Sequence, residues 1–131
     1  MKTAKRATSA EAEALKVNEK KWTKALMLAG WTVLPNIILE CQSALKLKPT
    51  DVNVLLHLAR HWWAADNHPH PAKGTIAKRM GVTPGTVRRS VRKLEKAGLI
   101  KRHYRKNDAR GNLPNLYDFT GLIEKVTPLA K

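Results

Sequence analysis

Apolar residues recur at helical spacing through the first half of the chain. An amphipathic helix with one buried face is predicted where they fall at i, i+1, i+4, i+7 and i+8, at Ile37, Ile38, Cys41, Ala44 and Leu45. A central core helix follows, with Thr50 as its N-cap and Asp51 at the positive end of its dipole. Its broad apolar stripe comprises Val52, Leu55, Leu56, Ala59, Trp62 and Trp63.

The opening residues lack such a stripe. Residues 1–21 are rich in Ala, Lys and Glu, and apolar positions stay sparse until Trp22, Leu26 and Ala29 fall at helical spacing before Gly30. We therefore expect a basic, flexible arm over residues 1–21 and one folded domain over residues 22–131.

A helix-turn-helix pattern begins at Thr75. Ala77 is small enough for two helices to cross closely, Gly81 suits a left-handed turn, and Val87 packs the second helix against the first. The second helix is predicted to have Thr83 as N-cap, Pro84 as its first residue and Gly98 as its stop. Its inner face is Val87, Val91, Leu94 and Ala97, and its outer face is Thr86, Arg88, Arg89, Arg92, Lys93 and Lys96.

A β-hairpin is predicted behind this motif. Residues 99–105 alternate as a strand, residues 106–114 form a turn region, and residues 115–120 alternate again. A short helix over residues 121–126, ended by Pro128, completes the chain. The predicted fold class is mainly α with a small β-hairpin, a winged helix-turn-helix with an N-terminal helical extension.

Positive charge is concentrated on the same segment. Residues 73–110 carry thirteen Lys or Arg residues against Glu95 and Asp108, a net +11 of the formal +15. Charge gathered on one supersecondary unit is typical of a footprint for a polyphosphate, whereas uniform charge would indicate only solubility.

Four stretches of sequence resemble winged helix-turn-helix domains of regulators and replication initiators from phages, plasmids and other bacterial mobile elements. They lie within residues 31–130 and read WTVLPNIIL, TDVNVLLHLARHWW, TIAKRMGVTPGTVRRSVRKLEKAGLI and NLYDFTGLI. The resemblance implies a DNA-facing recognition helix from Pro84 and a basic wing around residues 106–110. Gly85 departs from the family, whose members more often carry a polar side chain there, and this implies close backbone approach or weak base recognition at that position.

The resemblance and the charge together predict the DNA-binding residues. Contacts to base edges are expected from Thr86, Arg88 and Arg89. Phosphate and wing contacts are expected from Lys73, Thr83, Arg92, Lys93, Arg105, Lys106 and Arg110, with Pro84 and Gly85 in the same interface.

Other chemistries have less support. His57 and His61 have the spacing of paired zinc ligands, with His68 and His70 nearby, but no recognisable third ligand, so no metal site is predicted. The tryptophans Trp22, Trp31, Trp62 and Trp63 could stack on single-stranded nucleic acid, but core packing is the favoured interpretation. No phosphate-binding glycine loop, nucleophile elbow or HExxH motif occurs, so we expect neither an enzyme nor a cofactor.

The predicted function is sequence-specific binding of double-stranded DNA by a transcriptional regulator of a mobile genetic element. We expect a cytoplasmic, nucleoid-associated homodimer that does not bind membranes. The alternatives are a replication-initiation or partition protein, and a winged-helix adaptor that contacts DNA only within a larger nucleoprotein complex.

Overall fold

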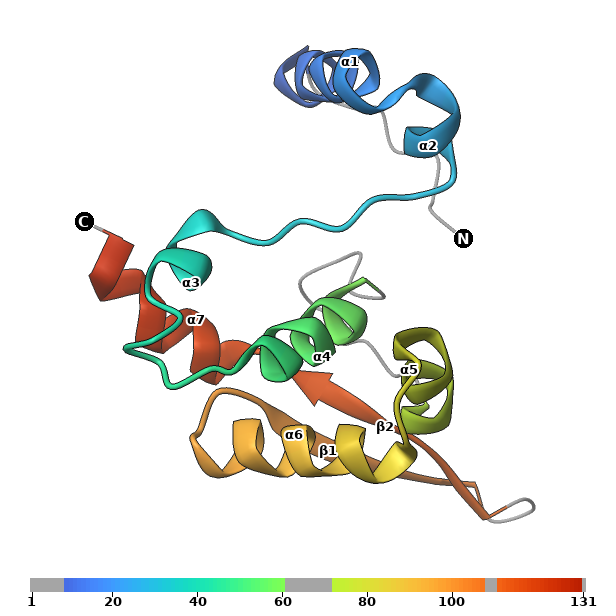
Figure 1. The fold of residues 1–131 in the computed structure, drawn as a ribbon, viewed down its shortest axis with the longest axis vertical. Helices are drawn as coiled ribbons and strands as arrows, with labels where there is room; N and C mark the ends of the chain where they lie inside the picture. The colour runs from blue at the N-terminus through green and yellow to red at the C-terminus, as the bar shows by residue number, and fades with distance from the viewer. Residues whose placement is uncertain (1–8, 61–71, 108–110, 131) are drawn as a thin grey trace. The chain divides into compact units, whose positions relative to one another are not determined.

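The computed structural model describes residues 9–60, 72–107 and 111–130 (Figure 1). The chain divides into two compact units, Met1–Thr32 and Val33–Lys131. The elements in chain order are α1 (Ser9–Trp22), α2 (Lys24–Leu28), α3 (Asn36–Glu40), α4 (Pro49–Ala59), α5 (Lys73–Met80), α6 (Pro84–Lys96), β1 (Lys101–Asn107), β2 (Gly111–Asp118), α7 (Thr120–Val126) and the 3-10 helix η1 (Thr127–Ala130).

The N-terminal unit is helical where the sequence predicted an arm. Helix α1 consists chiefly of the strong helix formers Ala, Glu, Lys and Leu, which favour a helix without a continuous apolar stripe. Thr23 ends α1 and caps α2, its hydroxyl accepting the Leu26 amide at 3.3 Å. Only Met27 of α2 is buried. The boundary between the compact units follows Thr32, whereas the predicted boundary followed residue 21.

Helix α3 is shorter than the apolar pattern predicted. It ends at Glu40, and turns carry the chain on, with Lys46 at a left-handed φ of 59° and the Leu47 amide donating to the Gln42 carbonyl at 3.0 Å. Ile38 is buried, and Leu45 still packs on the core from the turn. The apolar spacing therefore identified Ile37, Ile38 and Leu45 as inward side chains, but it was wrong for Ala44, which is exposed because the backbone beyond Glu40 is not α-helical.

Helix α4 begins two residues earlier than predicted, with Lys48 as N-cap in place of Thr50. Pro49 accounts for the difference, because its fixed φ and missing donor suit the first helical position. Asp51 then accepts the Lys48 amide at 2.9 Å. The predicted continuation of the stripe to Trp62 and Trp63 lies outside the described residues.

The second unit is a winged helix-turn-helix. Helices α4, α5 and α6 pack on one another, and β1 and β2 form an antiparallel hairpin after α6 (Figure 1). Its core draws fully buried side chains from all of these parts: Val54, Leu55, Leu58, Ile76, Val87, Val91, Leu94, Leu99, Tyr117 and Phe119. The predicted fold class is confirmed.

The hairpin strands are longer than predicted, because residues assigned to the turn pair in the ladder. Asn107 pairs with Gly111 and Lys106 with Asn112, so the predicted turn region 106–114 was too wide. The register shifts between His103 and Arg105, where two residues of β2 oppose one of β1. Pro114 lies at this bulge, where its missing amide donor breaks no regular ladder bond.

Helix α7 packs against the turn that follows α6. The Leu122 amide donates to the Leu99 carbonyl at 2.8 Å. A Cβ on Gly121 would overlap the Gly98 carbonyl oxygen, so glycine is needed for this close approach. Within the described ranges, no helix combines the length and apolar content needed to cross a bilayer.

Candidate nucleic-acid interface

The turn between α5 and α6 has the geometry that the sequence predicted. Gly81 adopts a left-handed φ of 72°, and the Val82 amide donates to the Ala77 carbonyl at 3.0 Å, which closes the end of α5. Ala77 and Val87 are buried, at 2% and 0% exposed, and belong to the same core cluster. This packing fixes the direction in which the outer face of α6 points.

The first turn of α6 holds a chain of polar side chains. Thr83 caps the helix by accepting the Thr86 amide at 3.3 Å, and the two threonine hydroxyls lie 3.1 Å apart. The Arg89 Nη2 donates to the Thr86 hydroxyl at 3.2 Å. Thr83, Pro84 and Thr86 thus lie where predicted, and Thr86 orients the Arg89 guanidinium at the N-terminal end of α6.

Gly85 leaves space that two guanidinium groups use. A Cβ at Gly85 would lie 3.4 Å from the Arg89 Nη1 and 3.6 Å from the Arg88 Nη2. A larger side chain would compete with both arginines for the surface beside Thr83. The departure from the family pattern at this position is therefore accompanied by two cationic groups gathered over the first turn of α6.

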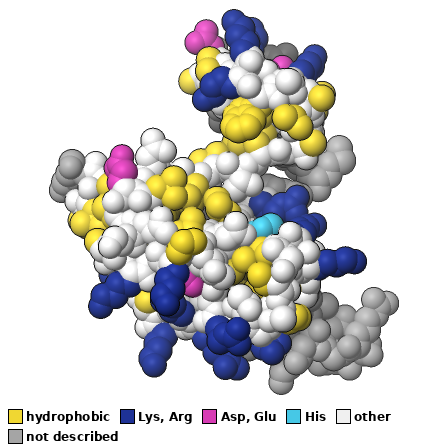
Figure 2. Space-filling view, in the orientation of Figure 1, with side chains coloured by type: hydrophobic (Ala, Val, Ile, Leu, Met, Phe, Trp, Pro, Cys, Tyr) yellow, Lys and Arg dark blue, Asp and Glu magenta, His cyan; other side chains and the backbone are white. Residues whose placement is uncertain are grey.

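Exposed cations continue along α6, and Figure 2 shows Lys and Arg side chains gathered on the side of the unit where Figure 1 places this helix. Arg88, Arg89, Arg92 and Lys96 are exposed. Lys73, at the start of α5, is half-buried, and burial lowers its pKa, with further lowering from Arg102, Arg88 and Arg92. Side chains from α5, α6 and β1 thus concentrate positive charge at one place, an arrangement that favours an anion.

Arg102 is held rigidly within this group. Its Nε lies 3.1 Å from both Glu95 carboxylate oxygens, and its Nη2 lies 2.8 Å from Oε1. This two-pronged ion pair joins β1 to α6 and neutralises part of the local charge. The sequence analysis did not single out Arg102. The sequence feature that could have identified Arg102 is its place two residues after the apolar Ile100 and seven residues after Glu95, an acidic residue in a basic helix.

Lys93 differs from the role expected of it. Its Nζ lies 2.6 Å from the Asp51 Oδ2, so its charge is already paired with an acidic residue of α4. The Ser90 hydroxyl donates to the Asp51 Oδ1 at 2.8 Å. Burial alone would raise the pKa of Asp51, but hydrogen bonds from Lys93, the Lys48 amide and Ser90 bring it below its ordinary value of 3.8.

This network was missed because Asp51 was assigned to the dipole of its own helix. Ser90 lies three residues after Val87, on the inner face of α6, where a polar side chain needs a buried partner. The same contact brings the start of α4 beside α6. Lys48 and Thr50 line a pocket there together with Thr86 and Arg89.

The predicted wing is only partly described. Arg105 and Lys106 lie in β1, but their side chains are outside the described part, as is Arg110 altogether. The structure therefore brings together the predicted residues Lys73, Thr83, Pro84, Gly85, Thr86, Arg88, Arg89 and Arg92, and leaves the wing contacts as predictions.

Among the residues that the structure describes, the histidines form no metal-ligating cluster. His57 Nδ1 is buried without a hydrogen-bond partner among the described residues, and burial, followed by Arg60 and Arg79, lowers its pKa. His61, His68 and His70 lie outside the described residues, within which no group of three metal-ligating side chains occurs. The prediction that the tryptophans pack in the core was wrong for Trp22 and Trp31, whose side chains are 58% and 52% exposed.

Comparisons with known proteins agree with the motif. The family model of a helix-turn-helix domain matches residues 45–100, from the end of the turn after α3 to the start of the hairpin. No curated protein sequence matches the chain.

Two solved structures are similar over a longer stretch. A crystal structure of MarR is 24% identical with a TM-score of 0.47 and covers 72% of this chain, which spans 61% of the MarR chain. The transcriptional regulator PA3341 is 23% identical with a TM-score of 0.46, covering 89% of this chain and 70% of its own. The fold assignment rests on the elements described above and on the matched helix-turn-helix domain.

Proposed function

We propose that the second unit binds double-stranded DNA with α6 in the major groove. The observation that carries this proposal is the exposed cationic face of α6, set on a matched helix-turn-helix domain and joined by Lys73 of α5. The major groove admits an α-helix and presents a different donor and acceptor pattern for each base pair. Arginine at the N-terminal end of such a helix can therefore select a sequence.

The proposed DNA contacts fall into two classes according to their position on the unit. Thr86, Arg88 and Arg89 lie in the first turns of α6 and are proposed to contact base edges, whereas Lys73, Thr83 and Arg92 are proposed to contact phosphates. Arg105, Lys106 and Arg110 would extend the phosphate contacts along the wing. The pairing of Lys93 with Asp51 favours an indirect role, in which Lys93 fixes the angle between α4 and α6.

The biological role proposed is transcriptional regulation for a mobile genetic element, by a homodimer acting on the bacterial nucleoid in the cytoplasm. The sequence resemblance to regulators of phages and plasmids supports the mobile-element context. A homodimer fits the usual design of helix-turn-helix regulators, in which two copies contact half-sites about one helical turn apart.

Selection of bound duplexes from a random pool, followed by footprinting of the selected DNA, tests this function. An inverted repeat protected by two copies would support a dimeric regulator. Tandem direct repeats would instead identify a replication initiator. Failure to enrich any duplex would contradict direct DNA recognition. If the protein then entered a nucleoprotein complex only through a partner, the adaptor function would be favoured.

A further inference from the structure

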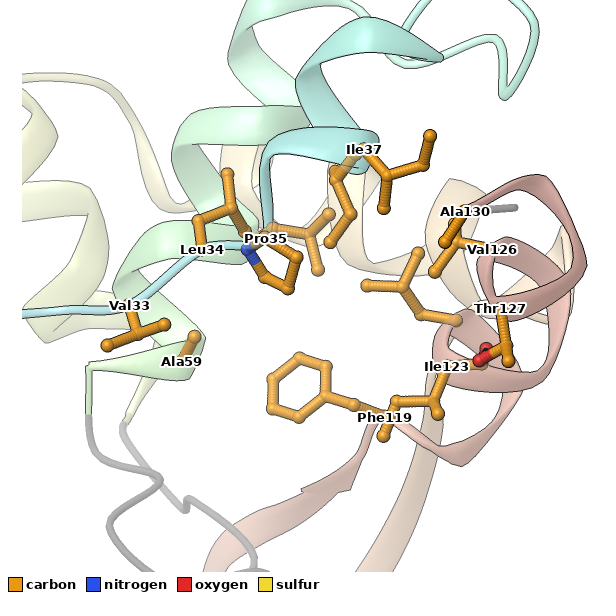
Figure 3. A pocket seen from close by; sticks show the side chains of 13 residues that line it. Val33, Leu34, Pro35, Ile37, Ala59, Phe119, Ile123, Val126, Thr127 and Ala130 are labelled. Atoms are coloured by element: carbon orange, nitrogen blue, oxygen red, sulfur yellow. Dashed lines mark hydrogen bonds between the residues drawn. The ribbon is translucent and has the colours of Figure 1, made fainter. Parts of the chain in front are cut away.

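A pocket of about 410 Å³ lies in the second unit, lined from three parts of the chain. Residues before and within α3 form one wall, α4 supplies Leu55 and Ala59, and Phe119 and α7 with η1 form the opposite wall. Figure 3 shows the labelled side chains of Leu34, Pro35 and Phe119 around a common hollow. None of the lining residues belongs to α5, α6 or the two strands, so this pocket is separate from the candidate DNA interface.

The chemistry of the lining restricts what could bind. Every lining side chain is aliphatic, aromatic or proline except Thr127. The Thr127 hydroxyl donates to the Ile123 carbonyl at 2.5 Å, so its proton is already used within the helix. A charged or strongly polar ligand would lose its hydration here without gaining a partner. An uncharged, mainly aromatic or aliphatic molecule has no strong hydration to lose, and it would bury apolar surface in the pocket.

The pocket has a closed base and an open rim. Leu55 and Phe119 are 1% and 2% exposed, whereas Ile123 and Val33 at the edge are 46% and 66% exposed. Its volume lies in the range of sites that bury small organic molecules. A concave apolar site of this size, with solvent access on one side, fits a small molecule better than a flat apolar face would.

One wall of the pocket is bonded to α6, and another is bonded to the turn that follows α6. The Leu122 amide of α7 donates to the carbonyl of Leu99 in that turn, at 2.8 Å. On the other side, α4 carries Leu55 one turn after Asp51, which holds Ser90 and Lys93 of α6. A molecule that changes the separation of α4 and α7 therefore acts on α6 directly through Asp51, and on the turn that follows α6 through Leu99.

We propose that this pocket binds one small, uncharged, hydrophobic molecule and that its occupancy regulates DNA binding by α6. The binding half of the proposal stands on the pocket alone. The regulatory half rests on the DNA-binding function proposed above, and it requires the molecule to have different affinities for the two arrangements of α6.

The binding half is tested with N-phenyl-1-naphthylamine, an uncharged aromatic probe whose fluorescence rises in apolar surroundings. The full-length protein should bind it saturably, with one probe per chain. Ala59→Phe and Ala130→Phe fill the pocket from opposite walls, and each should weaken binding at least tenfold. Ala44→Phe adds the same side chain at an exposed position outside the lining and should leave binding unchanged.

Three results would overturn the binding half. Absence of saturable binding would show that the pocket is closed or is covered by another part of the protein or by a second copy. Equal binding by all four proteins would show that the probe adheres elsewhere. Loss of binding in Ala44→Phe as well, with circular dichroism showing every variant folded, would show that the probe binds outside the pocket.

The regulatory half is tested on a selected duplex with and without saturating probe. Occupancy should change the DNA affinity at least fivefold, a size typical of coupling between sites, and Ala59→Phe should abolish that change. An unchanged DNA affinity with the pocket occupied would overturn regulation while leaving the ligand site intact. Absence of DNA binding in the unliganded protein would contradict the proposed function instead, and the probe titration would still decide the pocket.

Discussion

The hydroxyl of Ser90 on α6 lies 2.8 Å from the Asp51 carboxylate on α4, and both side chains are buried, at 6% and 3% exposed. Asp51 also accepts the Lys48 amide and the Lys93 ammonium. One carboxylate thus caps its own helix and fixes α6 relative to it. This arrangement makes the orientation of α6 depend on a residue outside the helix-turn-helix itself.

Asp51→Asn should lower the free energy of unfolding by about 1–3 kcal/mol near neutral pH, because it replaces charged hydrogen bonds at a buried site. The pKa of Asp51 lies below 3.8 in the folded protein, so its stabilising contribution is complete above that value and is lost as the pH falls through the folded pKa. Urea unfolding of both proteins at about pH 7 and about pH 3 measures the difference.

The control for that comparison is Glu40→Gln, which removes an exposed carboxylate at the end of α3. It should change stability by less than about 0.5 kcal/mol at either pH. A difference between Asp51→Asn and the native protein that persists undiminished in acid would mean that Asp51 acts through its shape and not through its charge.

Gly121→Ala should destabilise the second unit by about 1–3 kcal/mol, since the added methyl group would overlap the Gly98 carbonyl and push α7 away from α6. Gly74→Ala is the matched control. Its added Cβ would meet nothing within 4 Å, and alanine favours a helix over glycine, so stability should be unchanged or slightly raised. Thermal unfolding distinguishes the two, and equal melting temperatures would contradict the close approach of α7.

Removal of residues 1–32 should leave a cooperatively folding protein, because every residue of the main core cluster lies between Ile38 and Val126. The amide signals of the second unit should keep their dispersion in the shortened chain. A broad, non-cooperative melt would show that the N-terminal unit contributes to folding of the winged helix.

Binding to random duplex should fall steeply with salt. Each phosphate contact by a cation contributes about −0.9 to the slope of log K against log salt, so the five cations Lys73, Arg92, Arg105, Lys106 and Arg110 give roughly −4 to −5 per protomer. Lys93 is left out of this count because Asp51 already neutralises it. Fluorescence anisotropy across a salt series gives the slope, and a value near −1 would exclude this surface as a phosphate footprint.

The helix-turn-helix was predictable from sequence because its signals are local. Gly81 is placed by its left-handed turn, Thr83 by its capping hydroxyl and Val87 by helical spacing, and all three lie as expected. Helix α1 was not predicted because intrinsic propensity, and not an apolar stripe, forms it. The partners of Asp51 could not be predicted from spacing, since this contact joins α4 to α6 across 39 residues of sequence. The pairing of Arg102 with Glu95 depends on how the chain turns between α6 and β1.

The most direct test of the central claim compares Arg89→Ala with Lys125→Ala, which removes the same charge from the exposed surface of α7. Affinities are measured by fluorescence anisotropy for a selected duplex and for its scrambled counterpart. A two-pronged contact between Arg89 and guanine predicts a loss of about 5- to 150-fold on the selected duplex. On the scrambled duplex, Arg89→Ala should differ little from Lys125→Ala. Equal losses on both duplexes, or a loss on the selected duplex no larger than that of Lys125→Ala, would contradict base recognition by this face of α6.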